Sequence, residues 1–399
     1  MFSVRKVFSP AVGGVLRQFF RCRENVRLGS TYRAAILTEF NKIPKIEMIK
    51  VQENLFPGQV KVGVHFCSLN DTDVRILEGT ENVELPLVPG CEFSGEIVAV
   101  DPDNRLDFKV GDRVVALRGF HTSGGGLASE VVLSEFDCFP IGNISLKDAA
   151  ILPYGHGTAM LAFSKYCPLN ENDPVIVIAG PGGLGLGAIE VASSVFRAHV
   201  IGICDTQDSS ILIRDEGAFQ TICMSEGYAK IYRFLKNALG NRRARCIYDA
   251  VGGEALRLLE DFIDPQNGCI LTAYPLFNRE AFQASTPEYN VKPKDRLDRA
   301  EIDKLPPIHE RIQHVDLYSY QYSDRDFFRE IIEETLSLHS EDLISAHVSK
   351  IFTLDDLDDA VEFIKKKKCT GKVLIDLKEG KTKPKDDSDE SDNEDKRKD

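Results

Sequence analysis

The residues that could do chemistry begin with a glycine-rich loop over 180–185, which has the pattern G-x-G-x-x-G. It stands between an apolar β-branched run at 175–178, a predicted strand, and a segment of helical character. There Gly182 lets a pyrophosphate approach the backbone and Gly185 lets the helix pack on the strand, while the helix N-terminus favours phosphate. The alternative is a glycine-rich turn that binds no ligand. We predict a dinucleotide site at Gly180, Gly182, Gly183, Leu184 and Gly185.

An acidic residue follows the next predicted strand, 198–204. Asp205 stands at the distance from the loop where an acid normally accepts the ribose hydroxyls of NAD, whereas a basic residue accommodates the phosphate of NADP. Asp208 follows, no Lys or Arg appears before Arg214, and carboxylates would repel a phosphate. The sequence therefore favours NAD(H) over NADP(H). The alternative is that Asp205 caps the following turn.

The segments that must position these residues alternate in type. Short β-rich runs separated by Pro, Gly and Asp occupy 32–155 and indicate a compact barrel-like domain. After the loop, strands at 198–204, 245–250 and 268–273 alternate with helices, which implies a parallel sheet with right-handed crossovers. Residues 277–312 are charged and broken by prolines, so we expect a long excursion there. The expected fold class is α/β, with a β-rich domain and a doubly wound domain.

Composition and the two ends of the chain exclude some classes of function. The net charge of −13 argues against nonspecific nucleic-acid binding, and no apolar run is long enough for a membrane span. Ten cysteines without a C-x-x-C are typical of reduced, buried thiols. Residues 1–30 are rich in Arg and contain a single acid, Glu24. This composition predicts a mitochondrial transit peptide and a location in the matrix. The alternative is a basic interaction arm. Residues 379–399 are predicted to be a disordered acidic tail.

Several local motifs in order resemble those of the medium-chain dehydrogenase/reductase superfamily. They are V-P-G-C-E-F-S-G-E-I-V at 88–98, G-D-R-V at 111–114, A-A-I-L-P at 149–153 with G-T-A at 157–159, A-V-G-G at 250–253 and T-G-K-V at 370–373. The chain is most similar to the zinc-free quinone oxidoreductase branch. That resemblance implies a GroES-like catalytic domain at 31–155 and 325–378, and a Rossmann domain at 156–324. It also implies hydride transfer from NAD(P)H to a quinone or enone-like acceptor, and a homodimer paired near the strand 268–274.

The resemblance also bears on zinc. Zinc-dependent relatives place a Cys where this chain has Asn70, and their G-H-E is Gly90-Cys91-Glu92 here. A catalytic zinc needs three well-placed ligands, which Cys67 and Cys91 alone do not supply. We therefore expect no zinc and two buried thiols, which disfavours an alcohol dehydrogenase.

Site roles follow from the same resemblance. It implies that Asn70 faces the nicotinamide and the acceptor, and that Arg75 and Glu81 replace two tyrosines common near that pocket. The proton for the reduced acceptor then needs another donor, for which Tyr154 and His156 are candidates. Two alternatives to this function are an enoyl thioester reductase, and a binding or assembly protein that has lost turnover. Further residues implied beside the cofactor are Thr158, Val251 and Tyr274.

Overall fold

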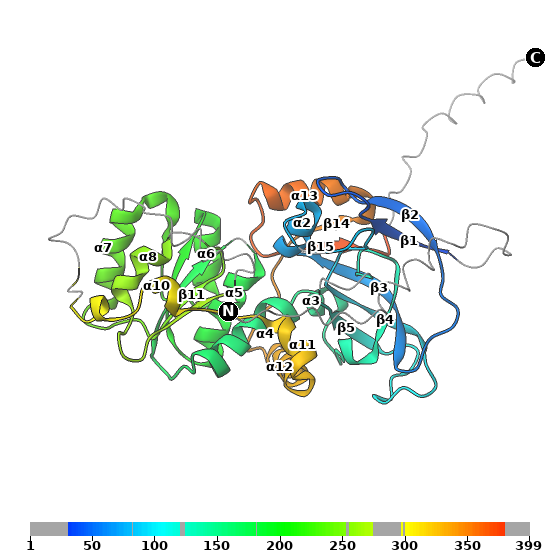
Figure 1. Cartoon of the computed structure of the whole chain (residues 1–399), viewed down its shortest axis with the longest axis horizontal. Helices are drawn as coiled ribbons and strands as arrows, with labels where there is room; N and C mark the ends of the chain where they lie inside the picture. Colours follow the sequence, from blue (N-terminus) through cyan, green and yellow to red (C-terminus); the bar gives the residue numbers. More distant parts are fainter. Residues whose placement is uncertain are drawn as a thin grey trace, which may run out of the picture.

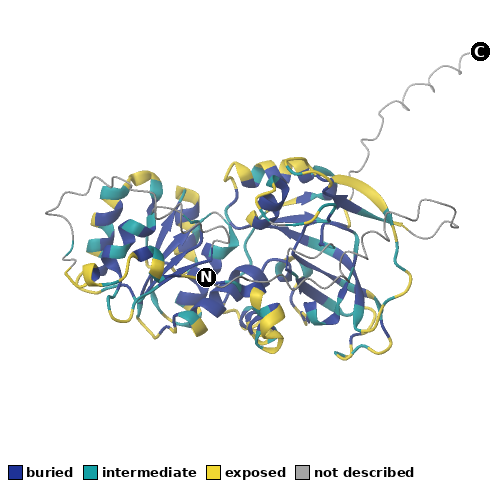
Figure 2. Cartoon of the chain, in the orientation of Figure 1, coloured by how far each residue is buried: buried dark blue, intermediate teal, exposed yellow. Residues whose placement is uncertain are grey.

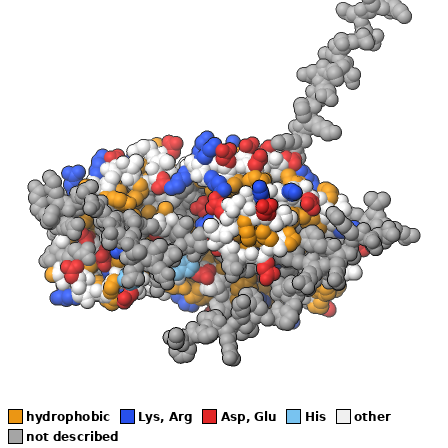
Figure 3. Space-filling view, turned by 45° about the horizontal axis from the view of Figure 1, so that its top comes forward, with side chains coloured by type: hydrophobic (Ala, Val, Ile, Leu, Met, Phe, Trp, Pro, Cys, Tyr) orange, Lys and Arg blue, Asp and Glu red, His pale blue; other side chains and the backbone are white. Residues whose placement is uncertain are grey.

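The computed structural model of the chain describes residues 31–81, 83–119, 124–180, 182–252, 255–273, 297 and 300–379. The predicted targeting segment 1–30, Tyr274 and all but the first residue of the predicted tail 379–399 lie outside the described residues. Two sheets lie side by side along the long axis of the molecule (Figure 1). Acidic and basic side chains are interspersed on the face shown in Figure 3.

One sheet has six parallel strands in the order β10-β9-β8-β11-β12-β13. Counted along the chain this order is 3-2-1-4-5-6, which is typical of dinucleotide-binding sheets. Every residue of β8 is buried, as expected for a central parallel strand covered on both faces. The strands are β8 (Pro174–Ala179), β9 (His199–Cys204), β10 (Gln220–Cys223), β11 (Cys246–Asp249), β12 (Cys269–Thr272) and β13 (Ile312–His314).

Helices cross between these strands, and the glycine loop leads into the first of them. They are α5 (Gly183–Glu190), α6 (Gln207–Asp215), α7 (Tyr228–Leu239), α8 (Ala255–Leu259) and α10 (Ile308–Arg311). The end of the predicted excursion 277–312 is in fact regular, because α10 and β13 occupy it. Since β13 pairs with β12, the strand near 268–274 at which we expected a homodimer to pair is not at the edge of the sheet.

The second sheet has seven strands and combines both ends of the described chain. Its order is β14-β15-β3-β4-β5-β7, with β6 also paired to β3. The C-terminal β15 is antiparallel to β3, so the chain returns to the sheet that its first part forms. The strands are β3 (Gln59–Leu69), β4 (Glu92–Val100), β5 (Arg113–Leu117), β6 (Glu130–Ser134), β7 (Cys138–Pro140), β14 (Val348–Thr353) and β15 (Lys372–Asp376), beside a pair β1 (Thr31–Ile36) and β2 (Lys45–Lys50).

The remaining helices accompany this second sheet or lie between the two sheets. They are α2 (Asp71–Glu78), α3 (Leu146–Ala149), α4 (Pro153–Leu161), α11 (Leu317–Ser323), α12 (Arg325–Ser340) and α13 (Leu357–Lys365). Short 3₁₀ turns span Glu135–Asp137, Met224–Glu226, Glu260–Phe262, Ile302–Lys304 and Leu354–Asp356, and π-helical turns span Ala162–Tyr166 and Val191–Val195. None of the described helices is both long and apolar enough to cross a membrane. The architecture confirms the predicted fold class, a GroES-like β-rich part with a Rossmann part.

The helices α4, α11 and α12 lie between the two sheets and share one buried core with both (Figures 1 and 2). The helices α4 and α5 approach closely at glycines, since a Cβ atom on Gly155 would lie 2.6 Å from the carbonyl oxygen of Gly183. On α12, Phe328 is fully buried and its ring meets that of Phe139 edge-on, with centroids 5.9 Å apart. The side chain of Phe328 therefore connects α12 to β7.

We predict that Phe328→Ala lowers the free energy of unfolding by about 3–5 kcal/mol, because it removes a fully buried ring and leaves a cavity in this shared core. Urea denaturation followed by circular dichroism measures the change. Phe219→Ala is the matched control, since that ring is 65% exposed and its loss should cost little. Equal effects of the two substitutions would contradict the assigned role of α12.

Candidate functional site

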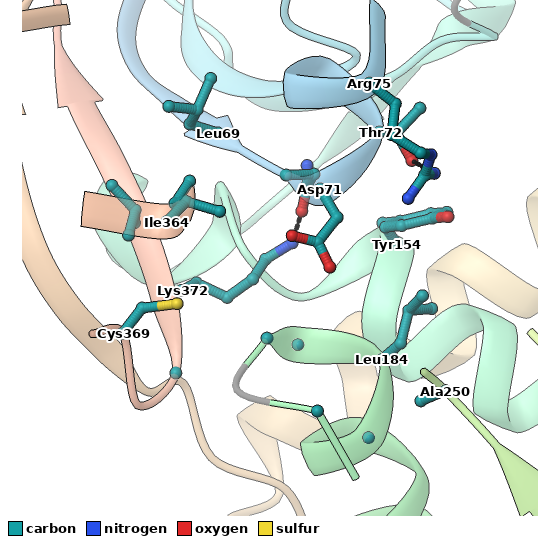
Figure 4. A pocket seen from close by; sticks show the side chains of 17 residues that line it. Leu69, Asp71, Thr72, Arg75, Tyr154, Leu184, Ala250, Ile364, Cys369 and Lys372 are labelled. Atoms are coloured by element: carbon teal, nitrogen blue, oxygen red, sulfur yellow. Dashed lines mark hydrogen bonds between the residues drawn. The ribbon is translucent and has the colours of Figure 1, made fainter. Parts of the chain in front are cut away.

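A cavity opens where the glycine loop faces the start of α2 and the start of β15. Figure 4 shows it: Lys372 reaches into it from β15, while Arg75 and Tyr154 stand on the far side. The predicted residues that line this cavity are Asn70, Tyr154, Gly180, Gly182, Gly183, Leu184 and Gly185. The fold therefore brings together residues that are more than a hundred positions apart in the sequence.

The glycines of the loop have different surroundings. A Cβ atom on Gly182 would meet nothing within 4 Å, so this position leaves open space in front of the first residue of α5. A Cβ atom on Gly185 would lie 2.6 Å from the Cα atom of Ala179, so this glycine is required for the packing of α5 on β8. Gly180 has Val251 beside it, 3.3 Å from such a Cβ atom. The loop thus fits a pyrophosphate, with its open space at Gly182 and a helix N-terminus behind it.

Gly183 makes room for a side chain of the protein itself. A Cβ atom here would lie 2.6 Å from Cδ of Lys372, so the aliphatic part of Lys372 crosses the loop at this glycine. Lys372 is the main site residue that sequence reasoning missed. In the sequence, Lys372 belongs to the T-G-K-V motif, but no role was predicted for it. A Lys in an otherwise apolar strand indicates that its charge has a buried partner.

The Lys372 ammonium group lies in a buried polar network with Glu92 and Asn70. Its Nζ atom is 2.7 Å from Oε2 of Glu92 and also donates to Oδ1 of Asn70. The side chains of Lys372 and Glu92 are 5% and 0% exposed. The other oxygen of Glu92 accepts the backbone N–H of Tyr154 at 2.8 Å. The network therefore links β15, β4 and the start of α4, and it places a fixed positive charge beside the glycine loop.

The network occupies the positions where zinc-dependent relatives have their metal motifs. Asn70 stands at the cysteine position, and its Nδ2 atom is 3.9 Å from Sγ of Cys91. Burial, together with the nearby Asp73 carboxylate, raises the pKa of the Cys91 thiol well above its ordinary value. The thiol of Cys67 is buried with its pKa raised for the same reasons. Both thiols are therefore favoured in the protonated form, whereas a metal would bind the thiolate.

Asp73 holds the backbone around Asn70. Its Oδ2 atom accepts the N–H of Asn70 and its Oδ1 atom accepts the N–H of Gly90, both at 2.9 Å. Burial raises the pKa of Asp73 to about 6, against the opposing effect of these two hydrogen bonds. The carboxyl group thereby ties the start of α2 to the loop that carries Cys91 and Glu92, which is a structural role.

Tyr154 separates the first cavity from a second one. The second cavity is lined also by Thr158, Glu81 and Ala273, while Thr158 donates to the carbonyl oxygen of Tyr154 at 2.6 Å. The Tyr154 ring stacks on Tyr318, with centroids 5.3 Å apart. Burial raises the pKa of the Tyr154 hydroxyl, so this group stays protonated and acts as a hydrogen-bond donor.

Arg75 and Glu81, which stand where the resemblance places two tyrosines, form a buried ion pair. Nε of Arg75 lies 3.1 Å from Oε1 of Glu81, and the two side chains are 9% and 10% exposed. A second guanidinium nitrogen of Arg75 donates to Oγ1 of Thr72 at 2.9 Å. Since Arg75 lines the first cavity and Glu81 the second, the pair forms a polar wall where relatives have aromatic hydroxyls.

The structure does not place His156 at either cavity. Its Nε2 atom lies 2.7 Å from Oε2 of Glu190, between α4 and α5. The prediction that His156 donates a proton to the acceptor is therefore wrong, because successive residues of α4 point to different sides and this one faces α5.

Asp205 lies at the end of β9 and makes an ion pair. Its Oδ2 atom is 3.0 Å from Nζ of Lys367, which comes from the residues after α13. As for the alternative that Asp205 caps the following turn, the cap of α6 is Thr206, whose side chain accepts the N–H of Ser209 at 3.1 Å. A basic group does therefore stand beside Asp205, although none was visible in the neighbouring sequence.

Comparisons with known proteins agree with this architecture. The family of the alcohol dehydrogenase GroES-like domain matches residues 56–143. The chain is 30% identical over 358 residues to a quinone oxidoreductase-like protein 2 homolog of Nematostella vectensis, covering 88% of this chain and 90% of that protein. It is 29% identical over 355 residues to quinone oxidoreductase-like protein 2 of Mus musculus, covering 88% and 93%.

A solved structure shows the same fold at lower identity. The quinone oxidoreductase from Coxiella burnetii is 22% identical and superposes with a TM-score of 0.70, covering 87% of this chain and 100% of that one. The sequence motifs, the paired sheets and the nearly full-length relatives together show that the chain belongs to the quinone oxidoreductase-like proteins of the medium-chain dehydrogenase/reductase superfamily.

Proposed function

We propose that this protein is a zinc-independent, NAD(P)H-dependent oxidoreductase that transfers a hydride to a quinone or an enone-like carbonyl acceptor. The observation that carries the proposal is the Lys372 ammonium group, held by Glu92 and Asn70 beside the open space at Gly182. A bound nicotinamide cofactor supplies the hydride. The residues of the chain supply binding, orientation and a fixed electrostatic environment.

Each residue then has a distinct part. The backbone at Gly180–Gly185 binds the pyrophosphate, Asp205 accepts the ribose hydroxyls, and Thr158 lies on the nicotinamide side. Two N–H groups of Lys372 are used by Asn70 and Glu92, which leaves a third for the acceptor oxygen. As the hydride reaches the acceptor, negative charge grows on that oxygen, and a preorganised ammonium stabilises it. Holding donor and acceptor in contact provides the rest of the rate enhancement.

The runner-up is a binding or assembly protein that keeps the fold without turnover. The buried Arg75–Glu81 pair favours it, because this pair stands where relatives use tyrosines beside the acceptor. The two proposals differ in one measurement: steady oxidation of NADH or NADPH by a panel of quinones and enones. An alcohol dehydrogenase would in addition need zinc in the nucleotide cleft, and an enoyl thioester reductase would reduce an enoyl thioester in place of a quinone.

Location and assembly belong to the same proposal. The Arg-rich segment 1–30 supports import into the mitochondrial matrix. A homodimer would form by pairing across β13, which is the outer strand of the six-stranded sheet on the side of β12.

We predict that Gly182→Ala weakens NADH and NADPH binding by roughly tenfold or more while the protein stays folded, because the added methyl group occupies only the space left for the pyrophosphate. Fluorescence titration of the purified protein measures the affinities. Gly185→Ala is the comparison: its methyl group meets the backbone of Ala179, so both the melting temperature and binding should fall. Unchanged nucleotide affinity in Gly182→Ala would refute the assigned cradle.

Asp205 should determine the preference between the two nucleotides. We predict that Asp205→Ser weakens NADH binding roughly tenfold, since it removes hydrogen bonds to a charged acceptor, and improves NADPH binding because Lys367 is then free to meet a phosphate. The ratio of the two dissociation constants is the readout. Asp208→Ser, an exposed carboxylate nearby, should leave the ratio unchanged. A ratio that does not move in Asp205→Ser would place the ribose elsewhere.

Lys372 should matter for the chemical step more than for folding. We predict that the double variant Lys372→Met with Glu92→Gln retains nucleotide binding and loses roughly 100-fold in kcat, because it removes the cation without stranding a buried carboxylate. The single variant Lys372→Met should in addition lose stability. Lys365→Met, a surface lysine paired with Glu78, serves as the control for loss of one positive charge. Full activity of the double variant would remove Lys372 from the mechanism.

A further inference from the structure

A second group of titratable side chains lies away from the nucleotide cleft, where three elements meet. Glu190 ends α5, Glu216 follows α6, and His347 directly precedes β14. One ligand atom from each of these three residues lies within 4.8 Å of the others. In particular, Nε2 of His347 is 2.7 Å from Oε1 of Glu216. The proposed oxidoreductase chemistry uses none of the three.

Two carboxyl groups meet in this group with little exposure to solvent. The side chain of Glu190 is 2% exposed, and that of Glu216 is 15% exposed. Within the part of the chain that the structure describes, their ion-pair partners are only histidines, with no Lys or Arg among them. Two carboxylates that lie close together with little exposure to solvent repel each other unless a cation or a shared proton lies between them.

Neighbouring groups hold the carboxylate of Glu190 in place. The N–H of Ser345 donates to Oε1 of Glu190 at 2.8 Å, and His156 holds the other oxygen at 2.7 Å. Nδ1 of His156 is buried without a hydrogen-bond partner, which fits a neutral ring whose proton is on Nε2 and is donated to Glu190. Nε2 of His347 makes no hydrogen bond of normal geometry although Glu216 is close, so its lone pair is available.

We propose that Glu190, Glu216 and His347 bind a divalent transition-metal ion, for which Zn²⁺ is the best match. Zinc takes imidazole nitrogen and carboxylate oxygen at about 2.0–2.2 Å, so modest side-chain rotations bring all three atoms into its coordination sphere. A fourth position is left for solvent. His156 acts as a positioning residue by holding the Glu190 carboxylate. Glu216 and His347 are partly exposed and give the ion a way in.

The ion would join the two halves of the molecule. Glu190 and Glu216 belong to the nucleotide-binding part, whereas His347 belongs to the segment that leads into the seven-stranded sheet. The carbonyl oxygen of His347 accepts the N–H of Lys372 at 2.8 Å. Zinc here is therefore a structural ion behind the cleft, separate from the site that we propose to be free of zinc, and the inference does not depend on the proposed function.

The test uses the full chain without a polyhistidine tag, stripped with a chelator and titrated with Zn²⁺ by calorimetry. We expect about one equivalent bound and a higher melting temperature, since the ion binds the folded state. Glu216→Gln and His347→Ala should each weaken binding by at least about 100-fold, and His156→Phe by about 10- to 100-fold. His309→Ala removes a histidine that lies 3.9 Å from Glu310 and has no third ligand among the residues that the structure describes, and this variant should bind Zn²⁺ like the parent protein.

Co²⁺ in place of Zn²⁺ identifies the ligands. We expect a spectrum without a thiolate-to-cobalt charge-transfer band, because no cysteine belongs to the site. Failure of the parent protein to take up Zn²⁺ would overturn the proposal whatever the variants do. So would uptake that survives His347→Ala, or uptake that is lost in Cys91→Ser and shows a thiolate band, which would place the metal in the nucleotide cleft instead.

Discussion

The buried ion pair between Lys372 and Glu92 connects the parts of the molecule from which the cleft is built. Removing two charges from water costs several kcal/mol each, so such a pair persists only when geometry and further hydrogen bonds offset that cost. Here Asn70 and the N–H of Tyr154 provide them. Lys372 belongs to β15, Glu92 to β4 and Tyr154 to α4. The carboxylate of Glu92 therefore holds β15 and the start of α4 against β4. The pair also sets the electrostatics of the cleft, since it leaves an ammonium group beside the glycine loop.

In the zinc-independent function that we propose, the same pair supplies the positive charge that a metal ion would otherwise provide at this place. A cation near the acceptor oxygen is useful in any hydride transfer to a carbonyl, whether it is a metal or an ammonium group. Lys372 stands among Asn70, Cys91 and Glu92, where zinc-dependent relatives place their metal motifs. With a protonated Cys91 and an amide at Asn70, the donors suit a hydrogen-bonding cation.

The parts of this arrangement that could be predicted from sequence are local. The strand, the glycines and the helix of the nucleotide loop are adjacent in the chain, so Gly182 and Gly185 could be given separate roles that their surroundings in the structure match. The partners of Asp205 and Asn70 could not be found in this way. Lys367 is 162 residues from Asp205, and Lys372 is 302 residues from Asn70. The predicted role of His156 was wrong for a related reason. Its side chain pairs with Glu190 on α5, and the residues next to His156 in the sequence give no sign of this contact.

A backbone contact connects the two buried polar clusters of the molecule, one around Lys372 in the cleft and the other around Glu190, Glu216 and His347. The carbonyl oxygen of His347 accepts the N–H of Lys372, so the segment that faces Glu216 is hydrogen-bonded to the residue that faces the cleft. A Cβ atom on Gly371 would lie 2.6 Å from that same carbonyl oxygen, so a glycine is needed for the two backbones to approach this closely. The carboxylate cluster and the cleft are therefore connected through the backbone, and a movement of the segment that carries His347 would be transmitted to Lys372 by this hydrogen bond.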